Sequence, residues 1–162
     1  MIDMRRILVP TDFGDTSAAA LRYGIELARR FNARLFLFHV PEHPGAAAEA
    51  EYPIGIFETM QNAAHDRLRG LLTEKDAQEL EPQCAMRMGL PADEIVRYAH
   101  DHDINLIVMG THGRHGVARA LLGSVAEKVV RRATCPVLTV HRPEREFVVA
   151  SDVVTGGVEA AT

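Results

Sequence analysis

The chain has 162 residues, of which 47% are hydrophobic and 25% are charged, a composition typical of one globular domain and not of a disordered chain. Its net charge of −4 gives no support to general nucleic-acid binding, and no apolar run is long enough to cross a membrane or to act as a signal peptide. Its cysteines, Cys84 and Cys135, form no CxxC pair, so we expect a protein of the reduced cytoplasm without a disulfide framework or a zinc site.

Short apolar runs alternate with longer amphipathic segments along the chain. The apolar runs predict strands at 6–10, 34–40, 83–88, 105–109 and 136–141. The amphipathic segments predict helices at 15–31, 57–80, 91–102 and 124–133. Most of the strands are apolar on both faces, as parallel strands covered by helices are, so the pattern predicts an α/β domain with right-handed crossovers.

Several helix ends carry start signals. Asp15, Thr16 or Ser17 can cap the first helix, and Pro91 stands at a first-turn position of the third. Ser124 and Glu127 form an S-x-x-E pattern, which predicts a capping box at the start of the last helix.

Two segments interrupt the alternation. The segment 41–55 contains three prolines and two glycines and is predicted to be a long loop. The segment 143–162 has no clear periodicity, so we expect a partly disordered tail in which 146–150 could add a strand. The domain is therefore predicted to span 1–142.

Unusual residues follow two of the predicted strands. Pro10-Thr11-Asp12 ends the first strand, and Gly110-Thr111-His112-Gly113 ends the fourth. Ligands of open α/β sheets bind beyond the carboxyl ends of strands, where the strand order reverses. The segment from Gly110 to Arg132 holds five basic residues and one acid, so it carries +4 and the rest of the chain −8. A local basic patch on an acidic protein suits a small anion better than a long polyanion.

The glycines after the fourth strand suit a phosphate group. Glycine lets the backbone approach a ligand closely, and amides before a helix N-terminus form an anion site. Ser124 could contribute its hydroxyl and amide to that site, although taken alone it is better explained as a helix cap. Neither a Walker A motif nor a G-x-G-x-x-G fingerprint occurs in the chain.

The glycine spacing resembles that of a known family. Gly110-x-x-Gly113, nine residues and Gly123-Ser124 match the G-2x-G-9x-G-[S/T] signature of the ATP-binding branch of the universal stress protein family. The resemblance extends over about residues 4–141, through RRILVPTDFGDTSAAALRYGIELA, LFLFHV, GLPADEIVRYA, NLIVMGTHGR and ATCPVLTV in that order. It implies an open five-stranded parallel sheet in the order 3-2-1-4-5 with helices on both faces, Rossmann-like and similar to the adenine nucleotide alpha hydrolases.

The resemblance also implies an ATP site, with Mg²⁺ or Mn²⁺ as its candidate metal ion. The implied binding residues are Pro10, Thr11, Asp12, Val40, Met109, Gly110, His112, Gly113, Arg114, Gly123, Ser124 and Val125. The first three would hold the adenosine end, Val40 would pack against adenine, Met109 and Gly110 would lie under the ribose and first phosphate, and the others would surround the triphosphate. Without the resemblance, Asp12 would be interpreted as a turn residue and Val40 as part of the core.

The resemblance favours an ATP-binding, nucleotide-responsive regulator in the stress response. It also implies a homodimer through strand 136–141, because an apolar edge strand needs a cover; the tail is the alternative cover. A dedicated enzyme is not expected, since no general base can be assigned, although slow ATP hydrolysis stays open. A nucleotide-free dimeric interaction protein is the other alternative, and no membrane or nucleic-acid partner is expected.

Overall fold

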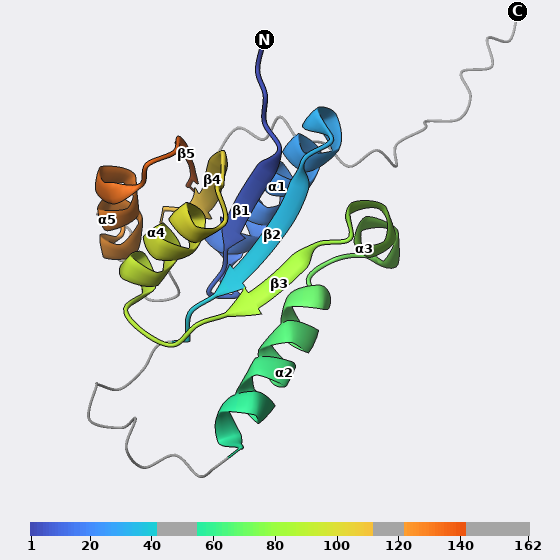
Figure 1. Ribbon diagram of the computed structural model, residues 1–162, viewed down its shortest axis with the longest axis vertical. Coiled ribbons are helices and arrows are strands. Elements are labelled where there is room, and N and C mark those ends of the chain that lie inside the picture. Colours follow the sequence, from blue (N-terminus) through green and yellow to red (C-terminus); the bar gives the residue numbers. More distant parts are fainter. Residues whose placement is uncertain (42–54, 112–121, 142–162) are drawn as a thin grey trace, which may run out of the picture.

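Five parallel strands form the sheet of this protein. The computed structural model describes residues 1–41, 55–111 and 122–141. The strands are β1 (Arg6–Pro10), β2 (Arg34–His39), β3 (Gln83–Met86), β4 (Leu106–Gly110) and β5 (Val137–Val140). They pair in the order β3-β2-β1-β4-β5, which confirms the predicted topology and sets β1 beside β4 at the centre of the sheet (Figure 1).

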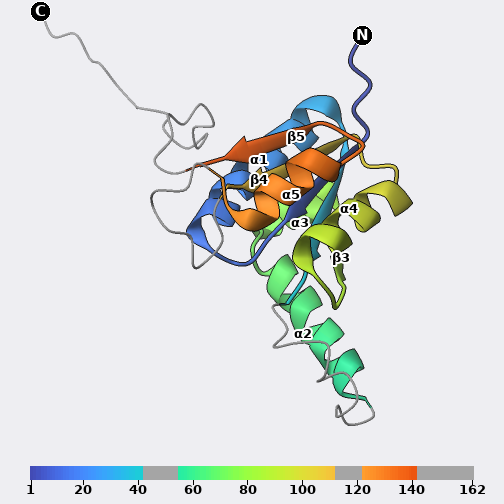
Figure 2. The same cartoon turned by 90° about the vertical axis from the view of Figure 1, so that its left-hand side faces the viewer.

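Helices cover both faces of this sheet (Figures 1 and 2). They are α1 (Asp15–Phe31), α2 (Ile56–Arg69), α3 (Glu74–Leu80), α4 (Pro91–Asp101) and α5 (Ser124–Arg132). One core cluster joins α1 and the inner end of α2 to the sheet, and a second cluster joins α4 and α5 to its other face. Across the described ranges, every helix is too short or too polar to cross a membrane.

Strand β1 shows why the sequence pattern is apolar at successive positions. Ile7 and Val9 lie in the α1 cluster, whereas Leu8 lies in the α4–α5 cluster, and all three are fully buried. Successive side chains of a strand point to opposite faces, so a central strand of a doubly covered sheet has no solvent-facing position.

The segment 57–80, predicted as one helix, forms two helices instead. Helix α2 ends at Arg69 with Gly70 as its C-cap, and α3 begins after Thr73. The Thr73 hydroxyl accepts a hydrogen bond from the Asp76 amide at 3.1 Å, and the Asp76 side chain accepts from the Thr73 amide, which completes a capping box. Arg29 of α1 also pairs with Asp76, so the break is stabilised by a tertiary contact that helical periodicity does not encode.

The predicted caps of α1 are also wrong. Its N-cap is Gly14, with no side-chain cap, although the helix covers the predicted residues 15–31. Neither Asp15, Thr16 nor Ser17 is the cap, because the preceding turn is held by the side chains of Thr11 and Asp12.

The remaining strands and helices occur where predicted, with ends that differ by two residues at most. The loop prediction for 41–55 falls mainly outside the described residues, and the predictions of a tail at 143–162 and a strand at 146–150 fall wholly outside them.

Candidate functional site

The carboxyl ends of β1 and β4 meet at the point where the strand order reverses. The chain leaves β1 towards β2 on one side, while β4 and β5 lie on the other. The two central strands are in register at Leu8 and Ile107, so their ends lie at the same edge of the sheet. Such a switch point is where open α/β sheets bind ligands.

Thr11 is a structural centre of the turn after β1. Its amide donates to the Phe38 carbonyl at 2.9 Å, which extends the pairing with β2. Its hydroxyl accepts from the Phe13 amide at 2.9 Å and donates to Ser17 Oγ at 3.0 Å, and Ser17 in turn donates to the Gly14 carbonyl at 2.9 Å. The Thr11 side chain is buried, so its role in the described structure is to hold the turn.

Asp12 follows directly and is partly exposed at this edge. Its Oδ1 accepts a hydrogen bond from the Gly14 amide at 3.0 Å, so the turn interpretation of Asp12 is observed. A carboxylate can accept several hydrogen bonds, so this turn bond orients the group and is compatible with a contact to a ligand hydroxyl or amine.

Gly110 ends β4 and lies against the start of α1. A Cβ atom built at this position would lie 2.8 Å from the carbonyl carbon of Thr16. Close packing of β4 on α1 therefore requires glycine here, independently of any ligand.

Thr111 connects β4 to both of the following elements. Its amide donates to the Val140 carbonyl at 2.8 Å, and its carbonyl accepts from the Gly123 amide at 2.6 Å. Thr111 is buried, and these bonds fix the start of α5 beside the end of β4. The sequence gives no special signal for this bridge, because the two segments are separated by more than ten residues.

Helix α5 begins without a side-chain cap. Its N-cap is Gly123, and the predicted capping box between Ser124 and Glu127 does not form. Glu127 is exposed and pairs instead with Arg131 one turn later, at 3.1 Å. The amides of a first helical turn have no acceptor inside the helix, so this N-terminus keeps its capacity to bind an anion.

An apolar wall stands next to this helix end. Val40, just after β2, and Met109 of β4 are buried in the same cluster, and Val125 packs against it. Leu122 also packs against this cluster and was not predicted as a site residue; its position directly before the glycine cap is the signal that could have identified it. Three predicted site residues from separate segments thus belong to one apolar cluster on the same face of the sheet.

The remaining predicted site residues are His112, Gly113 and Arg114, which lie outside the described residues. Pro10 is the last residue of β1 and pairs with Phe38 of β2. The described part of the candidate site therefore consists of the Asp12 turn, the apolar wall and the start of α5.

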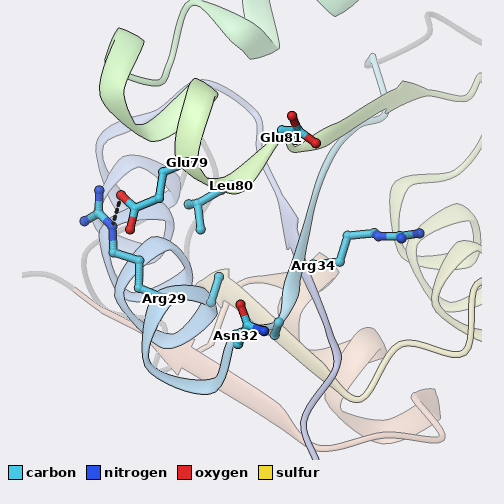
Figure 3. A pocket seen from close by; sticks show the side chains of 8 residues that line it. Arg29, Asn32, Arg34, Glu79, Leu80 and Glu81 are labelled. Atoms are coloured by element: carbon cyan, nitrogen blue, oxygen red, sulfur yellow. Dashed lines mark hydrogen bonds and ion pairs between the residues drawn. The ribbon is translucent and has the colours of Figure 1, made fainter.

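A pocket of about 290 Å³ lies at the opposite edge of the sheet, between the end of α1 and the end of α3 (Figure 3). The residues labelled there are Arg29, Asn32, Arg34, Glu79, Leu80 and Glu81. Arg29 pairs with Glu79 at 3.1 Å and with Glu26 at 2.6 Å. The Glu79 and Glu81 carboxylates that line the pocket would repel phosphate groups, so this pocket is a poor site for a nucleotide.

Metal-binding and thiol groups are scattered in the described ranges, where no cluster of three or more His, Cys, Asp or Glu residues could hold a metal ion. His102 stacks on Tyr98 with ring centroids 3.8 Å apart, whereas His100 is exposed, so the two histidines do not share a site. Cys84 and Cys135 are free, and burial raises the pKa of both thiols, which favours their protonated, unreactive form.

Comparisons with known proteins identify similar sequences and similar folds. The profile of the universal stress protein family matches residues 4–141. The universal stress protein MJ0531 of Methanocaldococcus jannaschii is 35% identical over 145 residues, which cover 88% of this chain and 85% of that protein. The structure of hypothetical protein MJ0577 from the same organism superposes with a TM-score of 0.68 at 26% identity, covering 89% of this chain and 100% of the other.

A crystal structure of a universal stress protein in complex with cAMP is also similar. It has a TM-score of 0.57 and 26% identity, and the match covers 86% of this chain and 98% of that one. The matched family profile and the relative above 30% identity lead to one conclusion: the chain belongs to the universal stress protein family.

Proposed function

We propose that this universal stress protein binds ATP at the carboxyl edge of its sheet, between β1 and β4, and acts as a nucleotide-responsive regulator in the stress response. One observation carries the proposal: a carboxylate turn, an apolar wall and an uncapped helix start converge at the switch point of the sheet. An adenine nucleotide needs these three kinds of surface for its ribose, its base and its phosphates.

In the proposed complex, adenine packs against Val40, Met109 lies under the ribose and first phosphate, and Val125 lies at the triphosphate end. Asp12 contacts the ribose or the base. The phosphates extend towards Gly123 and Ser124, where first-turn amides and the helix dipole favour negative charge. Gly110 and the segment His112-Gly113-Arg114 complete the triphosphate site, and Mg²⁺ or Mn²⁺ would enter bound to the phosphates. The similar structure with cAMP supports an adenine nucleotide as the ligand class.

The described acids favour binding over rapid hydrolysis. Asp12 belongs to the nucleoside end of the proposed site, and Glu127 is directed along α5 to Arg131. Hydrolysis requires a group that orients or deprotonates a water molecule near the last phosphate, and neither carboxylate is placed for that role. We therefore propose a regulator whose state depends on bound nucleotide.

The first prediction is that the purified chain retains or binds ATP. Mass spectrometry of ligand released on denaturation, followed by calorimetric titration of the emptied protein, tests it. ATP is expected to bind more tightly than cAMP, because its triphosphate carries more negative charge to the first-turn amides of α5. A chain that binds neither nucleotide at micromolar concentration would contradict the proposal, and tighter binding of cAMP would contradict its triphosphate part.

The second prediction concerns Asp12. Asp12→Ala is expected to weaken ATP binding by about 1–3 kcal/mol, the value of one or two polar contacts to a charged group. Asp12→Asn is the matched control, because its amide oxygen can still accept from Gly14 and hold the turn. Titration and thermal unfolding are measured on all three chains. A lower melting temperature with unchanged ATP affinity of folded Asp12→Ala would restrict Asp12 to the turn.

A further inference from the structure

The turn that presents Asp12 contains a strained residue. Phe13 has a φ of 64°, in the left-handed region that bulky residues rarely adopt. Such a conformation costs free energy and persists only where surrounding contacts compensate for that cost. Two hydrogen bonds hold the turn around Phe13. The Thr11 hydroxyl accepts from the Phe13 amide, and the Asp12 carboxylate accepts from the Gly14 amide. A relaxed Phe13 would therefore weaken the turn hydrogen bond that orients the Asp12 carboxylate.

Three contacts hold the Phe13 side chain in place. Its ring packs against the core on the α1 side of the sheet. The His39 ring lies 4.6 Å away, centroid to centroid, and the His39 Nδ1 atom is 2.8 Å from the Thr11 carbonyl oxygen. On the ring face, the guanidinium carbon of Arg67 lies 3.7 Å from the Phe13 centroid, within the range of a cation–π contact.

Arg67 brings a separate helix into contact with the turn. It lies near the end of α2, next to Leu68, which is fully buried in the α1-side core. Both views show the first part of α2 projecting away from the sheet (Figures 1 and 2). Its outer part is exposed, with 48% of the Phe57 surface accessible. Among the described residues Arg67 has no ion-pair partner, so its guanidinium interacts with the face of the Phe13 ring instead.

We propose that Arg67 is a positioning residue for nucleotide binding. By packing on Phe13 it holds the strained turn that contains Asp12. It thereby couples nucleotide binding to the packing of α2 against the sheet. This inference rests on the proposed ATP site and adds a residue outside the family signature. Coupling between two sites is reciprocal, so ATP that orders the turn also stabilises the inner end of α2.

Arg67→Gln removes the charge while keeping a long side chain and a good helix former. We expect ATP affinity to fall by up to about fivefold, the limit set by the free energy of one exposed cation–π contact. Arg69→Gln is the matched control. Arg69 is also exposed on α2, and its substitution removes the same charge while leaving the Arg67–Phe13 contact in place. Arg67→Lys, which keeps a cation, is expected to restore part of the affinity.

Titrations with adenosine and ATP separate positioning from direct contact. An effect transmitted through Asp12 lowers the affinity for both ligands by the same factor, whereas a direct contact with phosphate lowers that for ATP alone. Hydrogen exchange provides a second readout: ATP is expected to slow exchange of the amides of residues 64–69 in the wild type and in Arg69→Gln, and less so in Arg67→Gln.

The outcomes distinguish this inference from the proposed function. If the wild type binds ATP and Arg67→Gln binds it equally well, or loses affinity for ATP alone, the positioning role is wrong and the ATP site stands. If the wild type binds no ATP, both proposals are wrong. A double variant with Phe13→Leu adds a check, because Arg67→Gln should then have no further effect on affinity.

Discussion

A chain with Gly123→Val is expected to fold and to lose ATP binding, with an affinity at least about 100-fold lower, or about 2.7 kcal/mol. Gly123 has φ −68° and ψ 155°, an extended conformation that valine adopts without strain. The hydrogen bond from its amide to the Thr111 carbonyl involves only backbone atoms, so valine can still form it. The branched side chain, however, would occupy the space through which a phosphate approaches the first-turn amides of α5.

Gly110→Ala is the contrasting control. A Cβ there would lie 2.8 Å from the backbone of Thr16, so overpacking is expected to lower the stability of the fold by about 1–3 kcal/mol. Gly123→Val replaces a favourable N-cap residue with a poor one and should cost about 1 kcal/mol. Calorimetric titration with thermal unfolding therefore separates the loss of stability expected at Gly110 from the loss of ligand binding without unfolding expected at Gly123.

Gly113→Val is expected to act like Gly123→Val, since the family signature gives both glycines the same role. Gly113 lies outside the described residues, so this expectation depends on the sequence alone. The double variant is the decisive measurement. Unchanged ATP affinity in a folded chain that carries both valines would contradict nucleotide binding at this edge.

Much of the fold could be predicted because strands and helices have different periodicities. The apolar run of β1 predicts a strand covered on both faces, and Ile7 and Leu8 are buried in opposite clusters. The strand order could not be derived from periodicity, because any order of five buried strands satisfies the same pattern; it came from the family resemblance. The break between α2 and α3 was missed because Thr73 and Arg29 stabilise it through specific contacts.

The candidate site divides in a similar way. Unusual residues at the ends of two strands direct attention to the Asp12 turn and to Gly110, whereas Gly123 enters the candidate site through the glycine spacing of the family. The conformation of Phe13 could not be predicted, because a bulky residue gives no signal for a positive φ that is imposed by tertiary contacts. The capping box of α5 was predicted from a pattern that also fits an uncapped helix, and Glu127 pairs with Arg131 instead.

The outer edge of strand β5 has backbone groups that can pair with a second chain. The Ile107 amide donates to the Pro136 carbonyl at 3.0 Å, and the Thr111 amide donates to the Val140 carbonyl at 2.8 Å. Parallel strands direct alternate residues to one neighbour, so the backbone groups of Val137 and Thr139 face the open edge. Within the described sheet no strand pairs with that edge, and the strand carries no charge that would discourage pairing.

We propose that two chains pair through residues 136–141, with the two copies of β5 antiparallel across a two-fold axis. Side-chain charges are a poor test of this pairing. Val140 is 4% exposed and belongs to the α1-side core, so a lysine there would destabilise the chain itself. The outward backbone groups are the better target.

Thr139→Pro is expected to dissociate the dimer at micromolar concentration. Proline removes the outward amide of residue 139 from both copies, at about 0.5–1.5 kcal/mol for each lost hydrogen bond, and its ring obstructs the approach of the partner strand. Thr139→Val is the matched control, because it keeps the amide and a side chain of the same shape. Light scattering should give the mass of a dimer for the wild type and Thr139→Val and the mass of a monomer for Thr139→Pro, with circular dichroism confirming that all three are folded. A monomeric wild type, or a dimer that persists in folded Thr139→Pro, would exclude pairing through this edge; a monomeric wild type would favour the residues after His141 as its cover.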